Sequence, residues 1–263
     1  MRQMARDLCV SERSMRRLIS KDMRLKSLRK KHVHSLNAAQ RHKRKENALK
    51  LLRKGRRIGW DRIWWSDEKL FTCNQVLNKQ NSRVIASSVK ALDPEHRFVQ
   101  RKQGGPKVMV WAAFSSHTKT RIIVIRSGLK MNSDVYQTKV LAKEVKNAGT
   151  KYFHGQRWLY QQDGAPNHTS RSTIAWLSEN RIPFIAPNEW PPSSPDLNPA
   201  DFCLWGLMEA EVNKAAHNSE ASLLKAIIAA WRKIPQEALR NACRAVPRRL
   251  RDVINADGGY IEK

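Results

Sequence analysis

Residues 157–201 read RWLYQQDGAPNHTSRSTIAWLSENRIPFIAPNEWPPSSPDLNPAD, and this stretch organises the interpretation of the whole chain. Residues 158–162 are aromatic and β-favouring, so we predict a short strand there. The Gly-Ala-Pro sequence that follows Asp163 stops the strand. Asp163 is therefore expected at a strand tip.

The remainder of the stretch predicts a helix, a strand and a second acid. Residues 168–177 have helical spacing of their apolar side chains, and residues 182–185 form the short apolar run of a buried strand. A proline-rich loop then leads to Asp201 at the start of an apolar helix. The order is that of a βαβ-like unit with a carboxylate at each end.

A third acid lies upstream. Residues 63–67, IWWSD, form another short aromatic and β-branched run that ends in Asp67 and is followed by Glu68. Three carboxylates on separate elements of an α/β core suit a two-metal phosphoryl-transfer site, because Mg²⁺ takes hard oxygen ligands. A single Asp more often caps a turn or a helix, and that alternative weakens when three acids occur together.

These residues carry a family resemblance. WSDEK at 65–69, QQDGAPNH at 161–168 and SPDLNPAD at 194–201 resemble, in that order, the catalytic blocks of mariner-like DNA transposases of the DDE/D class. The similarity runs over roughly residues 5–210. In this family the third acid follows an Asn-Pro pair by two positions, which selects Asp201 and not Asp196. The 37 residues between Asp163 and Asp201 match the all-aspartate branches of the superfamily.

The resemblance implies an RNase H-like fold in which Asp67, Asp163 and Asp201 hold two Mg²⁺ ions, with Mn²⁺ as a substitute. It also implies cleavage of double-stranded DNA at transposon ends, joining at TA dinucleotides, a homodimer and a nuclear location. Glu68 and His168 adjoin the acids, and we expect them either to tune the acids or to form only local hydrogen bonds.

Composition points independently to a polyanionic partner. The 263 residues carry a net charge of +27, and residues 1–57 contain 20 Lys and Arg against 4 Asp and Glu. Phosphate relieves the self-repulsion of so many positive charges, so nucleic acid is the natural partner. A basic protein of the ribosomal type fits less well, because the chain has nine Trp and acids at the predicted strand ends.

The cysteines and the hydropathy pattern favour a soluble intracellular protein with no membrane partner. The four cysteines, Cys9, Cys73, Cys203 and Cys243, are widely separated and form no metal-binding spacing. The sequence contains neither an apolar run long enough to cross a bilayer nor the apolar stretch of a signal peptide.

The N-terminal residues predict two helices, 2–8 and 12–20, joined by a tight turn and resembling part of a homeodomain-like helix-turn-helix. Ser11 is the expected N-cap of the second helix. Four of its residues are expected to face outward and bind DNA: Arg13, Ser14, Arg16 and Arg17. An ordinary basic helical hairpin is the alternative. Family members have further DNA-binding helices upstream, so we expect a truncated copy or fragment.

A basic linker is predicted next, with one helix over residues 38–52. It contains two clusters that we expect to contact the DNA backbone, Arg29, Lys30, Lys31 and Lys43, Arg44, Lys45.

The remaining patterns complete the predicted order of elements. Strands are expected at 63–67, 71–74, 108–114 and 121–126, with a hairpin at 115–120 and a helix at 134–145. Residues 220–254 are expected to be helical, with breaks near Pro235 and Pro247.

We therefore predict an α/β protein with an RNase H-like core, a mixed sheet flanked by helices, a partial helix-turn-helix before it and a helical C-terminus. The domain bounds are 1–24, 25–59 for the linker, 60–215 for the catalytic domain and 216–263 for a helical extension.

Two alternative functions share these features. A DNA-binding transposon relic would keep the fold and lose the reaction, but the intact acids argue against a decayed site. An RNase H-type nuclease acting on RNA–DNA hybrids would have no use for the basic helix-turn-helix or the SPDLNP block.

Overall fold

The computed structural model describes residues 2–23, 35–72, 107–125 and 131–261. They belong to two compact units, an N-terminal unit (Met1–Ser35) and a core unit (Leu36–Lys263), which are described separately. Four residues named above lie outside the described residues: Arg29, Lys30, Lys31 and Cys73.

The N-terminal unit contains the two predicted helices. Helix α1 (Arg2–Asp7) precedes α2 (Glu12–Arg17), which continues as the π-helical turn η1 (Leu18–Asp22). The Oγ atom of Ser11 accepts a hydrogen bond from the backbone N–H of Ser14 at 3.0 Å, so the predicted N-cap is confirmed.

The apolar side chains of this unit are only partly buried. Ala5 and Met15 are buried, whereas Leu8, Val10 and Leu18 are exposed. Two short helices thus leave most of their described apolar surface in contact with solvent.

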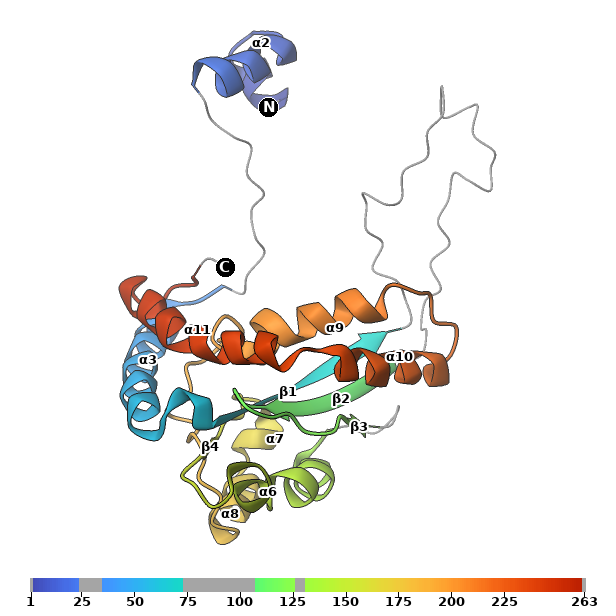
Figure 1. Ribbon diagram of the computed structural model, residues 1–263. Coiled ribbons are helices and arrows are strands. Elements are labelled where there is room, and N and C mark those ends of the chain that lie inside the picture. Colours follow the sequence, from blue (N-terminus) through green and yellow to red (C-terminus); the bar gives the residue numbers. More distant parts are fainter. Residues whose placement is uncertain (1, 24–34, 73–106, 126–130, 262–263) are drawn as a thin grey trace. The chain divides into compact units, whose positions relative to one another are not determined.

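The core unit is built on a mixed four-stranded sheet with the strand order β3-β2-β1-β4 (Figure 1). Strand β1 runs antiparallel to β2 and parallel to β4, and β2 forms the predicted hairpin with β3. The strands are β1 (Ile63–Thr72), β2 (Lys107–Phe114), β3 (Ile123–Ile125) and β4 (Leu159–Tyr160).

Helices cover both faces of this sheet (Figure 1). On one side lie α5 (Ser133–Val135), η4 (Tyr136–Val145), α6 (Ala148–Phe153), α7 (Pro166–Thr169) and α8 (Arg171–Glu179). On the other lie η5 (Ala200–Leu204), α9 (Trp205–Val212), α10 (Glu220–Lys233) and α11 (Gln236–Asn255). Helix α3 (Ala38–Ile58) packs against α11, and the short 3-10 helix η2 (Trp60–Arg62) leads into β1.

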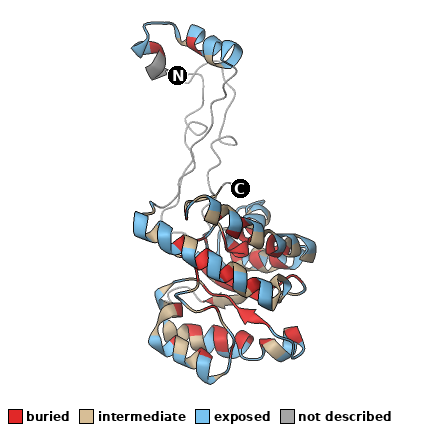
Figure 2. Cartoon of the chain, turned by 90° about the vertical axis from the view of Figure 1, so that its left-hand side faces the viewer, coloured by how far each residue is buried: buried red, intermediate tan, exposed pale blue. Residues whose placement is uncertain are grey.

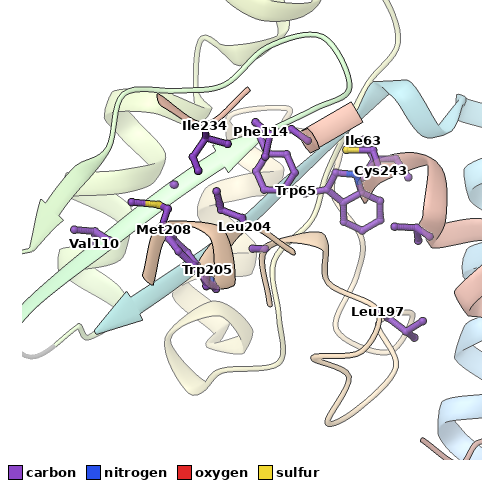
Figure 3. Packing of buried hydrophobic residues seen from close by; sticks show 14 of the residues in the cluster. Ile63, Trp65, Val110, Phe114, Leu197, Leu204, Trp205, Met208, Ile234 and Cys243 are labelled. Atoms are coloured by element: carbon purple, nitrogen blue, oxygen red, sulfur yellow. The ribbon is translucent and has the colours of Figure 1, made fainter. Parts of the chain in front are cut away.

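The alternation of side chains along β1 divides the core into two clusters. Trp65 faces the cluster that contains α9, α10 and α11, whereas its neighbour Trp64 faces the cluster of η4, α6 and α8. Figure 3 shows Trp65 in the first cluster with Phe114, Leu204 and Met208. Buried residues line the inner faces of the helices and exposed residues cover their outer faces (Figure 2).

Strand β1 differs from its prediction. Residues 63–67 and 71–74 were expected as separate strands, but β1 continues from Ile63 to Thr72, with Asp67 paired to Ala112 and Glu68 to Trp111. No Gly or Pro interrupts this run, so the ladder with β2 continues through its polar residues. Asp67 therefore lies in the middle of a strand and not at its end.

Two further expectations need correction. The expected strand at 182–185 is reduced to one bridge between Phe184 and Tyr160. Helix α11 contains Pro247 without a break. A proline removes one backbone hydrogen bond, but Val246, Leu250 and Val253 are fully buried on that helix, and this packing keeps it continuous.

Helix α3, which lies in the predicted linker, and the C-terminal helices pack within the core unit. The division between units falls after Ser35, and Ala48 and Leu51 of α3 are buried in the same cluster as Trp65. Leu223 of α10 and Leu250 of α11 lie there too. No helix in the described part of the chain is long and apolar enough to cross a membrane.

Candidate active site

Two consecutive acids of β1 point to opposite faces of the sheet. Asp67 shares its face with Trp65 and contacts Trp205, whereas Glu68 shares its face with Trp64 and contacts His168. A strand alternates its side chains, so this division follows directly from their adjacency. The two acids therefore have different neighbours despite being side by side in the sequence.

Asp67 is held by an indole. The Nε1–H of Trp205, the first residue of α9, donates to Asp67 Oδ2 at 2.7 Å. Burial and the neighbouring carboxylates of Asp201 and Glu68 raise the pKa of Asp67 well above its usual range, and the hydrogen bond from Trp205 opposes that rise.

Asp163 follows β4 in the turn before α7, near the position that the sequence predicted. Its Oδ1 accepts a hydrogen bond from the backbone N–H of Ala165 at 3.0 Å and lies 2.6 Å from His168 Nδ1. Burial by itself would raise the pKa of Asp163, but the hydrogen bond and the positive charge of His168 lower it. Of the three aspartates, Asp163 is accordingly the one whose surroundings favour the ionised form.

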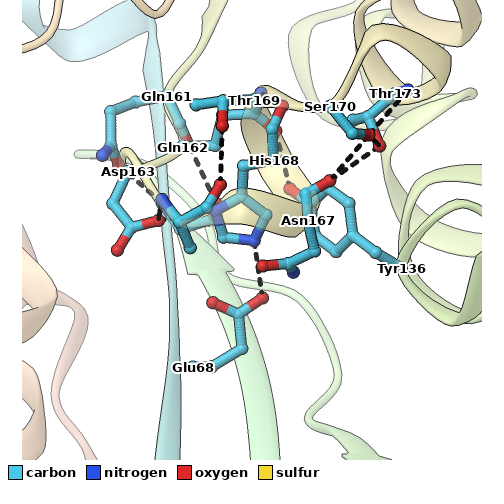
Figure 4. Close-up of polar contacts among 12 residues, drawn as sticks. Glu68, Tyr136, Gln161, Gln162, Asp163, Asn167, His168, Thr169, Ser170 and Thr173 are labelled. Atoms are coloured by element: carbon cyan, nitrogen blue, oxygen red, sulfur yellow. Dashed lines mark hydrogen bonds and ion pairs between the residues drawn. The ribbon is translucent and has the colours of Figure 1, made fainter. Parts of the chain in front are cut away.

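His168 joins Asp163 to Glu68. Its Nδ1 faces Asp163, and its Nε2 lies 3.2 Å from Glu68 Oε1, as Figure 4 shows. Burial favours the neutral imidazole, but Glu68 and Asp163 outweigh it and raise the pKa of His168 to about 10. Both accessory residues named from the sequence thus lie in one chain of contacts, in which His168 is buried and Glu68 and Asp163 are partly exposed.

A buried hydrogen-bond network supports this histidine. The Tyr136 hydroxyl bonds to the Tyr160 hydroxyl at 2.7 Å and donates to Gln162 Oε1 at 2.9 Å. Gln162 Nε2 donates to the backbone oxygen of His168 at 3.0 Å, and Ser66 Oγ bonds to the Tyr160 hydroxyl. This network holds the backbone of His168 in place, because every member is buried.

Asp201 is the second residue of the helical segment η5, which follows the proline-rich loop. Asn198 ties this loop to β1 by donating to Ser66 O at 3.4 Å, next to Asp67. Asp201 is exposed at the surface, and the protein around its carboxylate displaces only part of its hydration. This desolvation and the charge of Asp163 raise the pKa of Asp201 to about 6, against the opposing effects of Lys69 and Asn198.

Asp196, which the family motif does not select as the third acid, has a structural role. Arg44 of α3 is fully buried, and its guanidinium pairs with the Asp196 carboxylate at 2.8 Å. The same guanidinium donates to Ser194 Oγ and to the backbone oxygens of Ser193 and Gly258. Helix α3 thereby clamps the loop that leads to Asp201.

The three aspartates are electrostatically coupled but are not gathered around one point. In addition to burial, the charge of Asp201 raises the pKa of Asp67, and the charge of Asp163 raises the pKa of both. In the part of the chain that the structure describes, no group of three His, Cys, Asp or Glu side chains is arranged to hold a metal ion. Asp67 and Asp163 instead have separate partners, Trp205 for Asp67 and His168 for Asp163. The donor set of carboxylate oxygens nevertheless fits a hard divalent cation.

Comparisons with known proteins were made by family, sequence and structure. No protein-family model matches the chain. The Tc3 transposase of Caenorhabditis elegans is 32% identical over 204 residues, which cover 77% of this chain and 58% of that relative. The Tcb1 transposase of Caenorhabditis briggsae is 29% identical over 199 residues, covering 76% of this chain and 69% of the relative. The chain therefore spans less than two thirds of the Tc3 protein.

Solved structures of transposases have the same fold as this chain. The Mos1 transposase paired-end complex with left transposon end superimposes with a TM-score of 0.80 at 23% identity, covering 99% of this chain and 74% of that one. This chain is a relative of the mariner-like transposases. The catalytic domain of Mos1 mariner transposase matches with a TM-score of 0.66 at 20% identity, covering 88% of this chain and all of that one. The predicted RNase H-like fold class and helical C-terminus are confirmed.

The predicted DNA-contacting residues of this mariner-like chain fall into different environments. Arg13, Arg17 and Lys43 are exposed, and so is Ser14, although it bonds to the Ser11 cap. Arg16 is exposed and pairs with Glu12 at 2.6 Å.

Lys45 and Arg44 are engaged within the core unit. Lys45 pairs with Asp257 at 2.8 Å. Arg44 is a correction, because its buried guanidinium is occupied inside the protein and does not face solvent.

Sequence reasoning missed two kinds of residue at this mariner-like site. Trp205 lies in the apolar helix predicted after Asp201, and its hydrogen bond to Asp67 was not foreseen, although its position four residues after Asp201 places it one helical turn away. Tyr136 and Gln162 come from distant segments, and no pattern in the sequence signals that they meet.

Proposed function

We propose that this chain contains the catalytic unit of a mariner-like DNA transposase, which cleaves DNA strands and joins the released end to a target. The observation that supports this best is that one compact unit carries three acids on separate elements: Asp67 on β1, Asp163 after β4 and Asp201 in η5. Their order and motifs match the family, and curated relatives over most of the chain are transposases.

The three aspartates would hold two Mg²⁺ ions, for which Mn²⁺ would substitute. Structures of Mos1 transposase with Mg and with Mn support a divalent cation. When bound, the ions would activate the attacking oxygen and stabilise the leaving oxygen of the phosphodiester.

The chain's own residues prepare the site. His168 orients Asp163 and keeps it ionised, and Trp205 orients Asp67. The Arg44 clamp holds the loop before Asp201, so the third acid is presented by a rigid segment.

The proposed partner is double-stranded DNA. The net charge of +27 supports phosphate binding, and Mos1 has been solved in a paired-end complex with a transposon end. By resemblance we propose binding to transposon ends, joining at TA dinucleotides, a homodimer and a nuclear location.

The decisive experiment is a nicking assay on a labelled DNA duplex with Mn²⁺ or Mg²⁺. Wild-type protein is expected to nick DNA only with the metal, and Asp67→Ala, Asp163→Ala and Asp201→Ala are each expected to abolish nicking. The matched control is Asp61→Ala, which removes a half-exposed acid that pairs with His117 on the same unit. Nicking that survives all three substitutions would show that the site is assigned incorrectly.

The two alternative functions give different results in this assay. A DNA-binding relic would bind the duplex without nicking it, and an RNase H-type nuclease would prefer an RNA–DNA hybrid. The transposase relatives favour neither alternative.

A further inference from the structure

Trp205 differs from two other buried tryptophans of the core unit. The indole N–H groups of Trp64 and Trp65 are buried and have no hydrogen-bond partner. The indole of Trp205 is also buried, with 2% of the residue exposed, but it donates to Asp67 Oδ2 at 2.7 Å. A buried indole in this core can lack an acceptor or, like that of Trp231, donate to a backbone oxygen. The indole of Trp205 instead donates to a carboxylate, and that choice of acceptor calls for a separate reason.

The location of Trp205 gives that reason. It follows Asp201 by four residues, at the junction of η5 and α9, so one short helical segment carries the third acid and also contacts the first. Its ring packs edge-on against Phe71 of β1 at a centroid distance of 6.3 Å, two residues beyond the polar stretch of the strand. The packing against Phe71 thus fixes the position of the indole independently of its hydrogen bond to Asp67.

The chemistry of the donor fits a metal ligand. An indole N–H is a neutral donor and never accepts a proton, so it binds one carboxylate oxygen without cancelling the negative charge. Lys or Arg at this position would compete with a cation for that charge. Outer partners of this kind orient a ligand and tune the affinity of the metal.

We propose that Trp205 is the positioning residue for Asp67: it locks one carboxylate oxygen, turns the other toward the neighbouring acids, and ties Asp67 to Asp201 as one cation-binding pair. This inference rests on the proposed function, because it assumes that Asp67 and Asp201 bind a divalent cation.

The chain offers a matched control for the test. Trp231 is another buried tryptophan, 5% exposed, in the same hydrophobic cluster, and its Nε1–H donates to the backbone oxygen of Thr120 at 2.8 Å. Trp205→Phe and Trp231→Phe therefore remove the same ring and the same kind of buried donor, but only the first removes a donor to a catalytic acid.

The experiment is a thermal melt of the full chain over a range of Mn²⁺ concentrations, together with a Mn²⁺ titration of nicking. Both variants are expected to melt at a lower temperature than wild type without metal. Trp205→Phe is expected to need about 10- to 100-fold more Mn²⁺ than wild type for an equal rise in melting temperature and for half-maximal nicking. Trp231→Phe is expected to keep the wild-type midpoint.

A Mn²⁺ midpoint for Trp205→Phe that equals that of Trp231→Phe would overturn the inference. If Trp205→Phe does not fold, β-(3-benzothienyl)alanine at position 205 keeps the shape of the ring and replaces the N–H by sulfur, and the same shift is expected. Asp67→Asn distinguishes the metal site from the role of Trp205. An unchanged midpoint in Asp67→Asn would overturn the proposed metal site itself, whereas a shifted midpoint there with none in Trp205→Phe would overturn only the role of Trp205.

Discussion

The N-terminal unit buries Ala5 and Met15 among its described side chains, whereas the core unit encloses two hydrophobic clusters on the two faces of its sheet. Residues 1–35 carry 11 Lys and Arg against 3 Asp and Glu. The core unit has positive charge as well, but it also has the coupled aspartates and the buried polar network. Burial gives the core unit the rigidity that a catalytic site requires, and the N-terminal unit has charge with little burial.

The largest expected effect distinguishes the catalytic role of the core unit from the contribution of the basic N-terminal unit. Asp163→Ala should lower the rate of Mn²⁺-dependent nicking by about 10³-fold or more, because removing a metal ligand removes several kcal/mol of transition-state stabilisation. Deleting residues 1–35 should leave nicking by the core unit measurable at saturating DNA. Rates from a gel-based assay compare the two proteins. Loss of nicking in a folded deletion protein would contradict the assignment of catalysis to the core unit alone.

A second prediction concerns stability. Trp65 is fully buried at the centre of its cluster, so Trp65→Ala should lower the free energy of unfolding by about 3–5 kcal/mol. Met15→Ala removes a buried side chain of the N-terminal unit and should leave the main thermal transition unchanged. Circular dichroism melts of both variants test this. An equal loss in Met15→Ala would mean that the two units unfold together.

The third prediction divides DNA affinity between the units. Deleting residues 1–35 should weaken binding to a DNA duplex and flatten its salt dependence, by about 0.9 in the log–log slope for each phosphate that the shortened protein no longer neutralises. The deletion must stop there, because α3 is part of the core.

The control for that measurement is the exposed face of α11. Arg244, Arg248 and Arg251 are exposed, and replacing all three with Gln changes the charge of the core unit without touching the N-terminal unit. Fluorescence anisotropy at several salt concentrations gives both slopes. A slope that changes only in the α11 variant would place the DNA-binding surface on the core unit.

The smallest expected effect is a pH dependence of the core unit. The pKa of Asp201 is raised from 3.8 to about 6, so without metal the folded state binds this proton more tightly than the unfolded state. The stability from this group is present below about pH 4 and is lost as the pH rises through about 6. A metal ion competes with the same proton, so the Mn²⁺-induced rise in melting temperature should be larger at pH 7.5 than at pH 5.5.

Asp201→Asn is the check on that result. The Asn variant has no proton to release at this position and should show a smaller and flatter Mn²⁺ response over the same pH range. A wild-type response that does not vary with pH would contradict the prediction.

The sequence predicted the elements more reliably than their limits. The hairpin of β2 and β3, the Ser11 cap and the helices near residues 38–58 and 220–254 follow from local chemistry, because turn residues, caps and periodicity act over a few positions. The continuity of β1 through Asp67 and of α11 through Pro247 did not follow, since pairing and packing with distant segments decided both.

By itself, the sequence determined which acids match the family motif and selected Asp201 over Asp196 as the expected third acid, because the spacing of a motif can be read along the chain. Only the tertiary structure decided what each acid contacts. The alternation of β1 sends Asp67 to Trp205 and Glu68 to His168, and Arg44, basic and therefore a natural candidate for DNA, turns inward to Asp196. Contacts of this kind join residues about one hundred or more positions apart, and a local pattern holds no information about such pairs.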